Sequence, residues 1–254
     1  MKTQATTEYS DGAKSVPLLV ALIAVIVVIV GSSSCSGTSK QDVAANANAP
    51  QTASKHEVME VPPKNNSGAP PKTLADAGEY GENVYDMAKA SNWTKAAAKL
   101  NLLKESATRL KTEVQNASEL DRLASGITLL DQAVKSRNRQ TAMREANQIT
   151  LIVANLNTPY KLAVPIEVTK LDFYGRELEI WSAEKDTGKL HSTAVEMRRT
   201  WDAVRPAIES HKGKTEAKRF GDLVAKVEQA KTPDEYARLA TPVLDEVDNL
   251  ENVF

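Results

Sequence analysis

The sequence predicts an all-α protein in which a membrane anchor and a disordered linker precede two tandem antiparallel four-helix units of the up-down type. In the stretch 93–114, apolar residues recur at alternating spacings of three and four, as on the buried face of a helix in a bundle. A weaker copy of this pattern follows 94 residues later, over 190–208. Charged residues make up 26% of the chain and aromatic residues only 5%, which favours helix over sheet. The two apolar faces consist of Trp93, Ala96, Leu100, Leu103, Ala107, Leu110 and Val114, and of Leu190, Ala194, Met197, Trp201, Val204 and Ile208.

Charge and cysteine content exclude several classes of function. The formal net charge of −1 provides no overall field that would attract nucleic acid, so we expect no nucleic-acid partner. Cys35 is the only cysteine. An intrachain disulfide, a CxxC redox pair, a multi-cysteine zinc site and a CxxCH haem attachment are therefore all excluded.

Residues 1–35 carry the signal of a membrane anchor. Residues 16–30 are continuously apolar, and no charged residue occurs between Lys14 and Lys40. Fifteen apolar residues are short for a span of about 20 but sufficient for the core of a signal peptide. If the small residues 31–37 are included, the stretch becomes long enough to cross a membrane.

The apolar run together with Cys35 resembles a bacterial lipoprotein signal over residues 14–37. Ser33, Ser34 and Ser36 supply the small residues of that pattern, whereas Ser32 departs from it because the family usually has leucine three residues before the cysteine. The resemblance implies that Cys35 is lipidated and becomes the mature N-terminus. An uncleaved transmembrane helix and a signal cleaved without lipidation are the alternatives. All three place the rest of the chain outside the cytoplasm, in the periplasm or extracellular space of a cell envelope.

Residues 36–72 form the predicted linker, because Ser, Asn, Ala, Pro and Lys dominate there without periodicity. The first four-helix unit is expected over 73–157 and the second over 164–254. Asn92 and Ser118 are the expected N-caps of two helices in the first unit. The expected helices cover 73–90, 92–115, 118–136, 140–156, 164–185, 187–211, 215–231 and 233–254.

The two units align as an internal duplication. The offset is 94 residues, rises to 97 in the third helix as an insertion at 212–214 requires, and returns to 94 in the fourth. A chance alignment of two similarly patterned bundles is the alternative explanation. The identities include Tyr80 with Tyr174, Gly81 with Gly175, Arg122 with Arg219, Gln132 with Gln229, and Leu156 with Leu250.

No sequence signature of an active site is present, so the chain is not predicted to be an enzyme. We identify no nucleophile elbow, no glycine-rich phosphate loop and no Glu-x-x-His pair for a di-metal site. The three histidines, His56, His191 and His211, make no metal-binding pattern. We therefore predict no cofactor and no metal site.

The candidate ligand-binding residues are Arg198, Trp201, Arg205 and Trp181. Two arginines one heptad apart beside a tryptophan can clamp an anion by hydrogen bonds and stacking. Alternatively, the arginines lie on a solvated flank and pair with acidic neighbours such as Asp202. The tryptophans either enclose a pocket beside helices kinked by proline or simply fill the core.

These observations favour a membrane-anchored, extracytoplasmic helical module that binds an envelope protein or a small anionic ligand. A structural lipoprotein that scaffolds the envelope by self-association is the first alternative. A metal- or haem-handling bundle is the second alternative.

Overall fold

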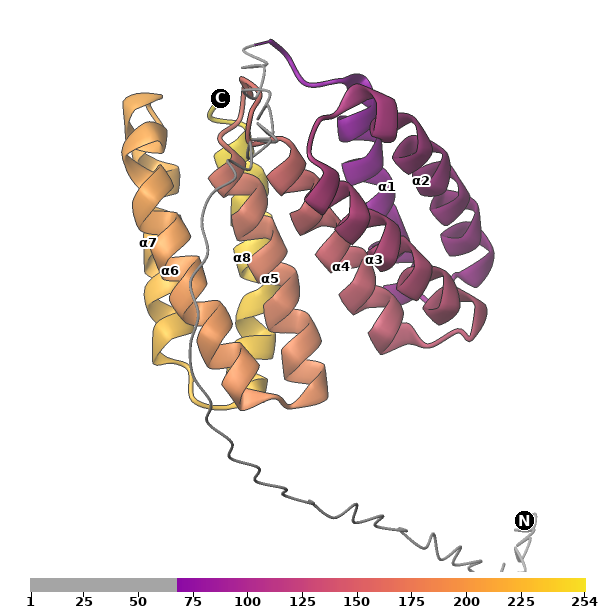
Figure 1. The fold of residues 1–254 in the computed structure, drawn as a ribbon. Helices are drawn as coiled ribbons and strands as arrows, with labels where there is room; N and C mark the ends of the chain where they lie inside the picture. The colour runs from indigo at the N-terminus through magenta and orange to yellow at the C-terminus, as the bar shows by residue number, and fades with distance from the viewer. Residues whose placement is uncertain (1–67) are drawn as a thin grey trace, which may run out of the picture. The chain divides into compact units, whose positions relative to one another are not determined.

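The computed structural model describes residues 68–254, which form eight α-helices and no strand (Figure 1). The all-α prediction is therefore confirmed for this part of the chain, and the ends of the expected helices shift by at most three residues. The helices are α1 (Lys72–Lys89), α2 (Trp93–Glu113), α3 (Ala117–Lys135), α4 (Arg139–Leu156), α5 (Ile166–Glu184), α6 (Thr187–Ser210), α7 (Lys214–Gln229) and α8 (Pro233–Glu251).

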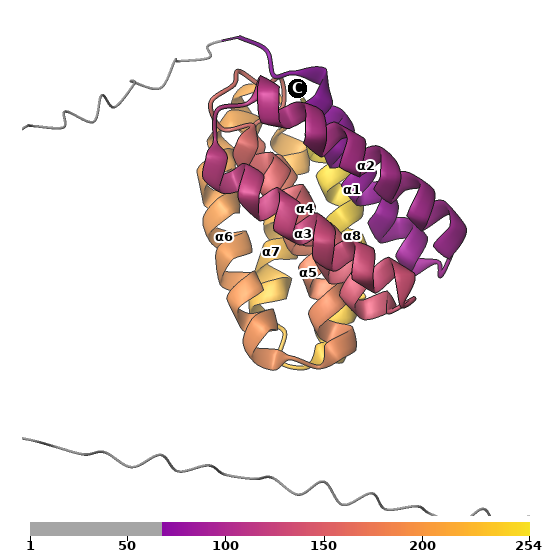
Figure 2. The same ribbon diagram turned by 45° about the vertical axis from the view of Figure 1, so that its right-hand side comes forward.

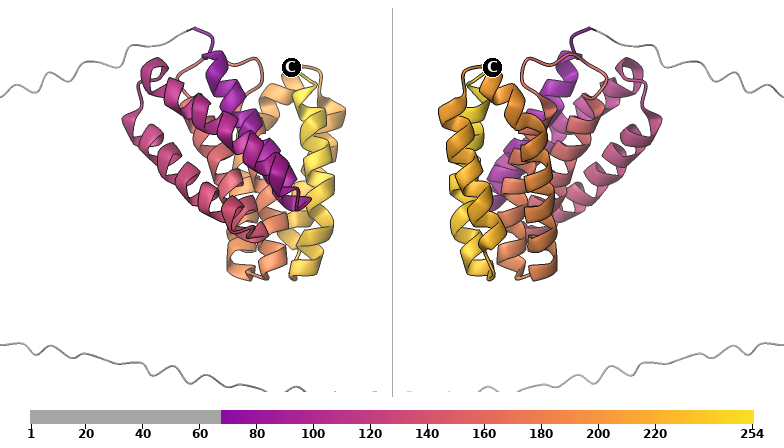
Figure 3. Two further views of the ribbon diagram at one scale, coloured as in Figure 1. Left: turned by 90° about the vertical axis from the view of Figure 1, so that its right-hand side faces the viewer. Right: turned by 90° about the vertical axis from the view of Figure 1, so that its left-hand side faces the viewer.

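Each helix packs against its neighbours in the sequence, and the contacts of α1 with α4 and of α5 with α8 are the main ones between helices that are not consecutive. α1 lies against both α2 and α4, and α5 lies against both α6 and α8 (Figures 1 and 2). Consecutive helices run in opposite directions, as the two side views in Figure 3 show. α4 also packs against α5, and all eight helices belong to one compact unit.

The predicted apolar faces of α2 and α6 line the core. Leu100, Leu103 and Leu110 of α2 are buried, whereas Trp93 and Ala107 are only partly covered. All six residues of the predicted face of α6 are buried. Full burial of one large apolar side chain contributes about 1.5–3 kcal/mol, so these faces supply much of the stability of the fold.

Side-chain caps fix most of the helix starts. Asn92 accepts a hydrogen bond from the backbone of Lys95 and caps α2 as predicted, and Thr232 forms a capping box with Glu235 at the start of α8. The prediction that Ser118 caps α3 is wrong. Asn116 caps that helix, since its side chain accepts from Glu119 N at 3.2 Å, and Ser118 lies inside the first turn.

The N-terminal predictions fall on residues that the structure does not describe. The anchor, Cys35 and most of the linker lie before residue 68, outside the described residues. Among residues 68–254, no helix combines the length and the apolar character that a membrane span requires.

Candidate functional site

A charged groove of about 550 Å³ lies between α6 and α7, which pack side by side (Figure 2). Four cationic side chains and two carboxylates face it, so its lining carries an excess of positive charge. Such a surface favours an anion over a cation or a neutral molecule. The principal lining residues are Arg198, Trp201, Arg205 and Glu209 of α6, and Lys214, Lys218, Gly221 and Asp222 of α7.

Trp201 forms the inner wall of the groove. Its side chain is fully buried and packs against Phe220, with the ring centroids 4.9 Å apart. The indole Nε1–H has no hydrogen-bond partner among the described residues. Gly221 lies beside this nitrogen, because a Cβ at that position would stand 3.6 Å from Nε1. The groove thus contains a buried donor whose hydrogen bond is unmet by protein, which is energetically costly until an acceptor reaches it.

Arg198 closes one end of the groove through a two-point ion pair with Glu228. Its Nε donates to Oε1 of Glu228 at 3.0 Å, and Nη2 donates to Oε2 at 2.7 Å. These bonds favour the charged forms, so they raise the pKa of Arg198 and lower the pKa of Glu228. A third contact, from Nη1 to Asp202 at 3.5 Å, follows the helical spacing. The guanidinium of Arg198 is therefore already occupied by protein carboxylates.

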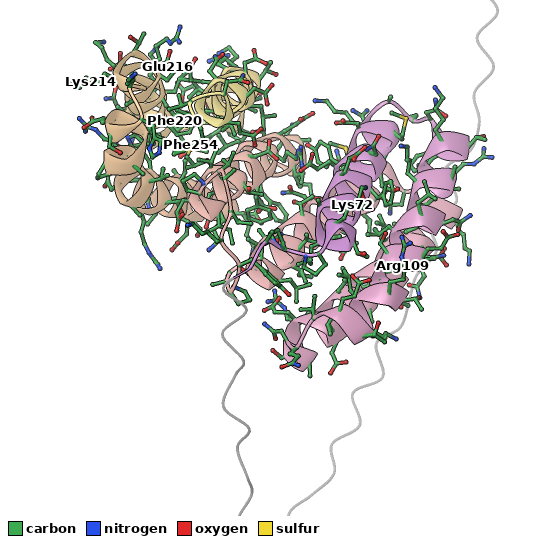
Figure 4. The ribbon with its side chains drawn as sticks, turned by 90° about the horizontal axis from the view of Figure 1, so that it is seen from above. Lys72, Arg109, Lys214, Glu216, Phe220 and Phe254 are labelled. Atoms are coloured by element: carbon green, nitrogen blue, oxygen red, sulfur yellow. The ribbon has the colours of Figure 1, made fainter. Side chains whose placement is uncertain are left out.

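The other cations of the groove keep donors that are not used within residues 68–254. Arg205 donates only its Nε, to Glu209 at 2.7 Å, and its two terminal nitrogens have no partner there. Lys218 pairs with Asp222 at 2.7 Å and lowers the pKa of that carboxyl by its hydrogen bond. Lys214 makes no ion pair within the described part and lies at the start of α7, at the outer side of the molecule in Figure 4.

Trp181 does not line the groove. Its indole N–H donates to Oε2 of Glu177, one turn earlier in α5, and the same carboxylate accepts from Asn147 of α4 at 3.3 Å. Burial raises the pKa of Glu177, and the hydrogen bonds from Trp181 and Asn147 oppose this rise. This network ties α5 to α4 inside the fold, so the surroundings of Trp181 are structural.

A second cluster of charges joins α1, α5 and α8. Arg176 of α5 pairs with Asp172 at 3.0 Å and with Glu82 of α1 at 3.7 Å. Burial raises the pKa of Glu82 to about 7, the Arg176 guanidinium opposes this, and the carboxylates of Asp172 and Glu251 add to it. Burial likewise raises the pKa values of Asp172 and Glu251. One arginine thus faces three carboxyl groups that resist ionisation.

Glu179 makes a neighbouring connection between α5 and α1. Its Oε2 accepts from the Tyr85 hydroxyl at 3.0 Å and from Lys89 Nζ at 2.8 Å. Burial and the carboxylate raise the pKa of Tyr85, so its hydroxyl remains a donor at neutral pH. These contacts hold α1 against α5 by polar bonds.

The structure brings together three of the four predicted ligand residues, Arg198, Trp201 and Arg205. Lys214, Lys218 and Gly221, which α7 adds to the groove, were not predicted from the sequence. The spacing of Lys214 and Lys218, one helical turn apart, was an available signal, whereas a glycine within a helical pattern gave none. Within residues 68–254, no three His, Cys, Asp or Glu side chains gather closely enough to hold a metal ion.

Compared with protein-family models, with curated proteins and with solved structures, the chain matches none of them.

Proposed function

We propose that the chain is a membrane-anchored, extracytoplasmic binding module that takes a small anion in the α6–α7 groove. The observation that carries this proposal is the groove itself, which Arg205, Lys214 and Lys218 line together with Trp201, whose buried indole N–H has no partner among residues 68–254. A concave surface of several hundred cubic ångströms with a few converging polar groups is typical of ligand sites. Because the sequence carries no signature of a nucleophile, a base and oxyanion donors, we propose binding without catalysis.

The anchor part of the proposal rests on the apolar run 16–30 and on Cys35. Lipidated Cys35, an uncleaved span and a cleaved signal predict different masses for the mature protein. Intact mass spectrometry of the chain from its natural host, beside the variant C35A, separates them. A diacylglyceryl adduct that C35A lacks supports lipidation, whereas a full-length unmodified chain in the membrane supports the span. Full-length chain in the cytoplasm contradicts both the anchor and the extracytoplasmic location.

We further propose that α1–α4 and α5–α8 are two copies of one four-helix unit. The helix starts support this, since α1 and α5, α2 and α6, and α4 and α8 begin 94 residues apart, whereas α3 and α7 begin 97 apart. The residues that flank α1 and α5 support it as well. Pro71 and Pro165 precede these helices with nearly the same backbone angles, and Ser91 and Lys185, which follow them, adopt positive φ at 56° and 58°.

Native mass spectrometry tests the binding function. The full chain is extracted from the membranes of its natural host in a mild non-ionic detergent and compared with the triple variant R205Q/K214Q/K218Q. We expect excess mass that denaturation removes and that the variant lacks. A bare monomer contradicts the proposal, and a discrete oligomer without excess mass favours the scaffolding alternative instead.

A further inference from the structure

We infer that the α6–α7 groove is a site for a tetrahedral oxyanion of the phosphate-ester type, held over Gly221 by Arg205, Lys218 and the indole N–H of Trp201. This inference rests on the proposed binding function and makes it more specific, since it names the chemistry of the anion.

The groove between α6 and α7 has a counterpart between α2 and α3 under the proposed duplication. At the proposed offsets, Lys104 and Asp131 correspond to Arg198 and Glu228, and these two residues also form an ion pair, at 2.5 Å. A bridge between the second and third helix therefore occurs in both halves. We conclude that the Arg198–Glu228 pair is part of the common scaffold and does not contact the ligand.

The remaining groove residues differ between the halves. Where the second half has Trp201, Lys214, Lys218 and Gly221, the first half has Ala107, Ala117, Asp121 and Ala124. The changes add a buried hydrogen-bond donor, replace one negative charge by a positive one, add a second positive charge and remove one Cβ. Two further lining residues change in the opposite direction, because Glu209 and Asp222 stand where the first half has Gln115 and Ser125 and add two negative charges. The second half therefore gains one positive charge on balance, together with the buried indole donor and the space beside it.

The groove offers more hydrogen-bond donors than a planar carboxylate can accept from. Arg205 has two terminal nitrogens without a partner among residues 68–254, Lys218 carries three ammonium hydrogens, and the indole presents one N–H. These donors come from two helices and from the inner wall between them. A carboxylate offers two oxygens in one plane, whereas a phosphate ester offers up to three terminal oxygens in different directions. The tetrahedral group therefore suits donors on several sides.

The indole can be approached only from the side of Gly221. Nε1 has almost no accessible surface, and the space that Gly221 leaves without a side chain is where a Cβ would stand 3.6 Å from it. The Arg205 and Lys218 side chains beside it are 56% and 77% exposed, and each is bound to one carboxylate of its own helix. Exposed ion pairs of this kind contribute little to stability, so both side chains can turn to an incoming anion at small cost.

Isothermal titration of the full chain in non-ionic detergent, at fixed ionic strength, tests the inference. The probes are inorganic phosphate and glycerol 3-phosphate as tetrahedral anions, and acetate and succinate as carboxylates. We expect the tetrahedral probes to bind at least about tenfold more tightly, as loss of one charge-assisted hydrogen bond implies. Equal binding of carboxylates overturns this inference but leaves the anion-binding function intact. Binding of no probe overturns the inference, and the mass-spectrometric experiment then decides the function separately.

Point variants locate the site. R205K keeps the charge but loses the planar fork, and we expect it to weaken phosphate binding about tenfold. G221A places a methyl group against the indole nitrogen without disturbing the fold, and we expect a loss of similar size. R199Q is the matched control, because Arg199 lies on the same helix, is 80% exposed and does not line the groove. Unchanged affinity in both R205K and G221A, or an equal loss in R199Q, overturns the site.

A last comparison identifies the source of the phosphate group. The titration is repeated with a short-chain phosphatidic acid and with glycerol 3-phosphate. Tighter binding of the lipid that G221A abolishes points to a membrane headgroup, and equal binding points to a soluble ester. Lipid binding that G221A leaves unchanged contradicts the groove as the site.

Discussion

The indole nitrogen of Trp201 and the α-carbon of Gly221 face each other across α6 and α7, so that a single added methyl group would contact the nitrogen at 3.6 Å. This distance is an ordinary van der Waals contact. Gly221 lies inside α7 with helical backbone angles, so its glycine is not required by the backbone. Its small size instead leaves the space beside the indole nitrogen without a side chain.

Replacement of Gly221 by alanine is therefore expected to stabilise the protein. Alanine within a helix is favoured over glycine by about 0.5–1 kcal/mol, and no atom is in the way. Urea denaturation followed by tryptophan fluorescence measures the change. The matched variant is G175A, because Gly175 also lies inside a helix but a Cβ there would stand 2.6 Å from Leu244 Cδ2. We expect G175A to destabilise by about 1–3 kcal/mol through overpacking. Destabilisation by G221A of the same size as by G175A would show that the groove is closed.

Stability is expected to depend on pH through Glu82. Its pKa is raised from 4.5 to about 7, so between these values the folded protein binds more protons than the unfolded chain. The free energy of unfolding should therefore fall as pH rises from about 5 to about 7.5. The Glu82 side chain is 40% exposed, and with the solvent screening this allows we expect a loss of only about 1 kcal/mol.

Denaturant titrations at several pH values, for the natural chain and for E82Q, measure this dependence. The amide of E82Q cannot ionise, so the decline should become shallower, and the raised pKa values of Asp172 and Glu251 account for what remains. The variant E113Q is a control, because Glu113 is exposed at the end of α2. An unchanged decline in E82Q contradicts the assignment.

Trp181 is expected to matter for stability and not for binding. In W181F the buried Glu177 loses the donor one turn away, and a buried acceptor without its partner costs about 1–3 kcal/mol. Thermal unfolding of W181F should show this loss, while the affinity for anions stays within about twofold, well below the effect of one lost hydrogen bond. W93F is the control for replacing a tryptophan that is only partly buried. A selective loss of anion binding in W181F would return Trp181 to the ligand site.

The ion pair of Arg198 with Glu228 is expected to contribute modestly. Both side chains are partly exposed, at 30% and 40%, so a double-mutant cycle with R198A and E228A should give a coupling of about 0.5–1 kcal/mol. The pKa of Glu228 is lowered in the folded state. Its stabilisation is therefore complete above the unfolded pKa and disappears as pH falls through the folded value. If the coupling between Arg198 and Glu228 persisted at a pH below the folded-state pKa of Glu228, the assignment of the ion pair would be contradicted.

Most of the helical fold could be predicted because the signal is periodic. Apolar residues at spacings of three and four mark a buried face, and all eight expected helices occur within residues 68–254. The cap of α3 was predicted wrongly since both Asn116 and Ser118 are good N-cap residues, and the sequence pattern does not decide between them. The non-helical backbone at Asn116, with φ −140° and ψ 82°, and the hydrogen bond that its side chain accepts from Glu119 N identify Asn116 as the cap.

The groove was predictable only on the side of α6. Arg198, Trp201 and Arg205 share a helix, so their spacing shows that they lie close together. Gly221 and Lys218 come from another helix, and which of their faces meets α6 depends on the register between the two helices. The partner of Arg198 was unpredictable for the same reason, because Glu228 lies 30 residues away.

The pairing of Glu82 with Arg176 has a consequence for how such a protein can be assembled. Under the proposed duplication these two residues occupy the same position in the two copies, as do Tyr85 and Glu179, which are 94 residues apart. In a symmetric dimer of identical subunits, a residue that lies near the two-fold axis faces the same residue of the other subunit. A glutamate at this position would therefore face a second glutamate. Joining both copies in one chain removes this restriction. One copy can then carry the acid and the other the base, and the contact becomes directional.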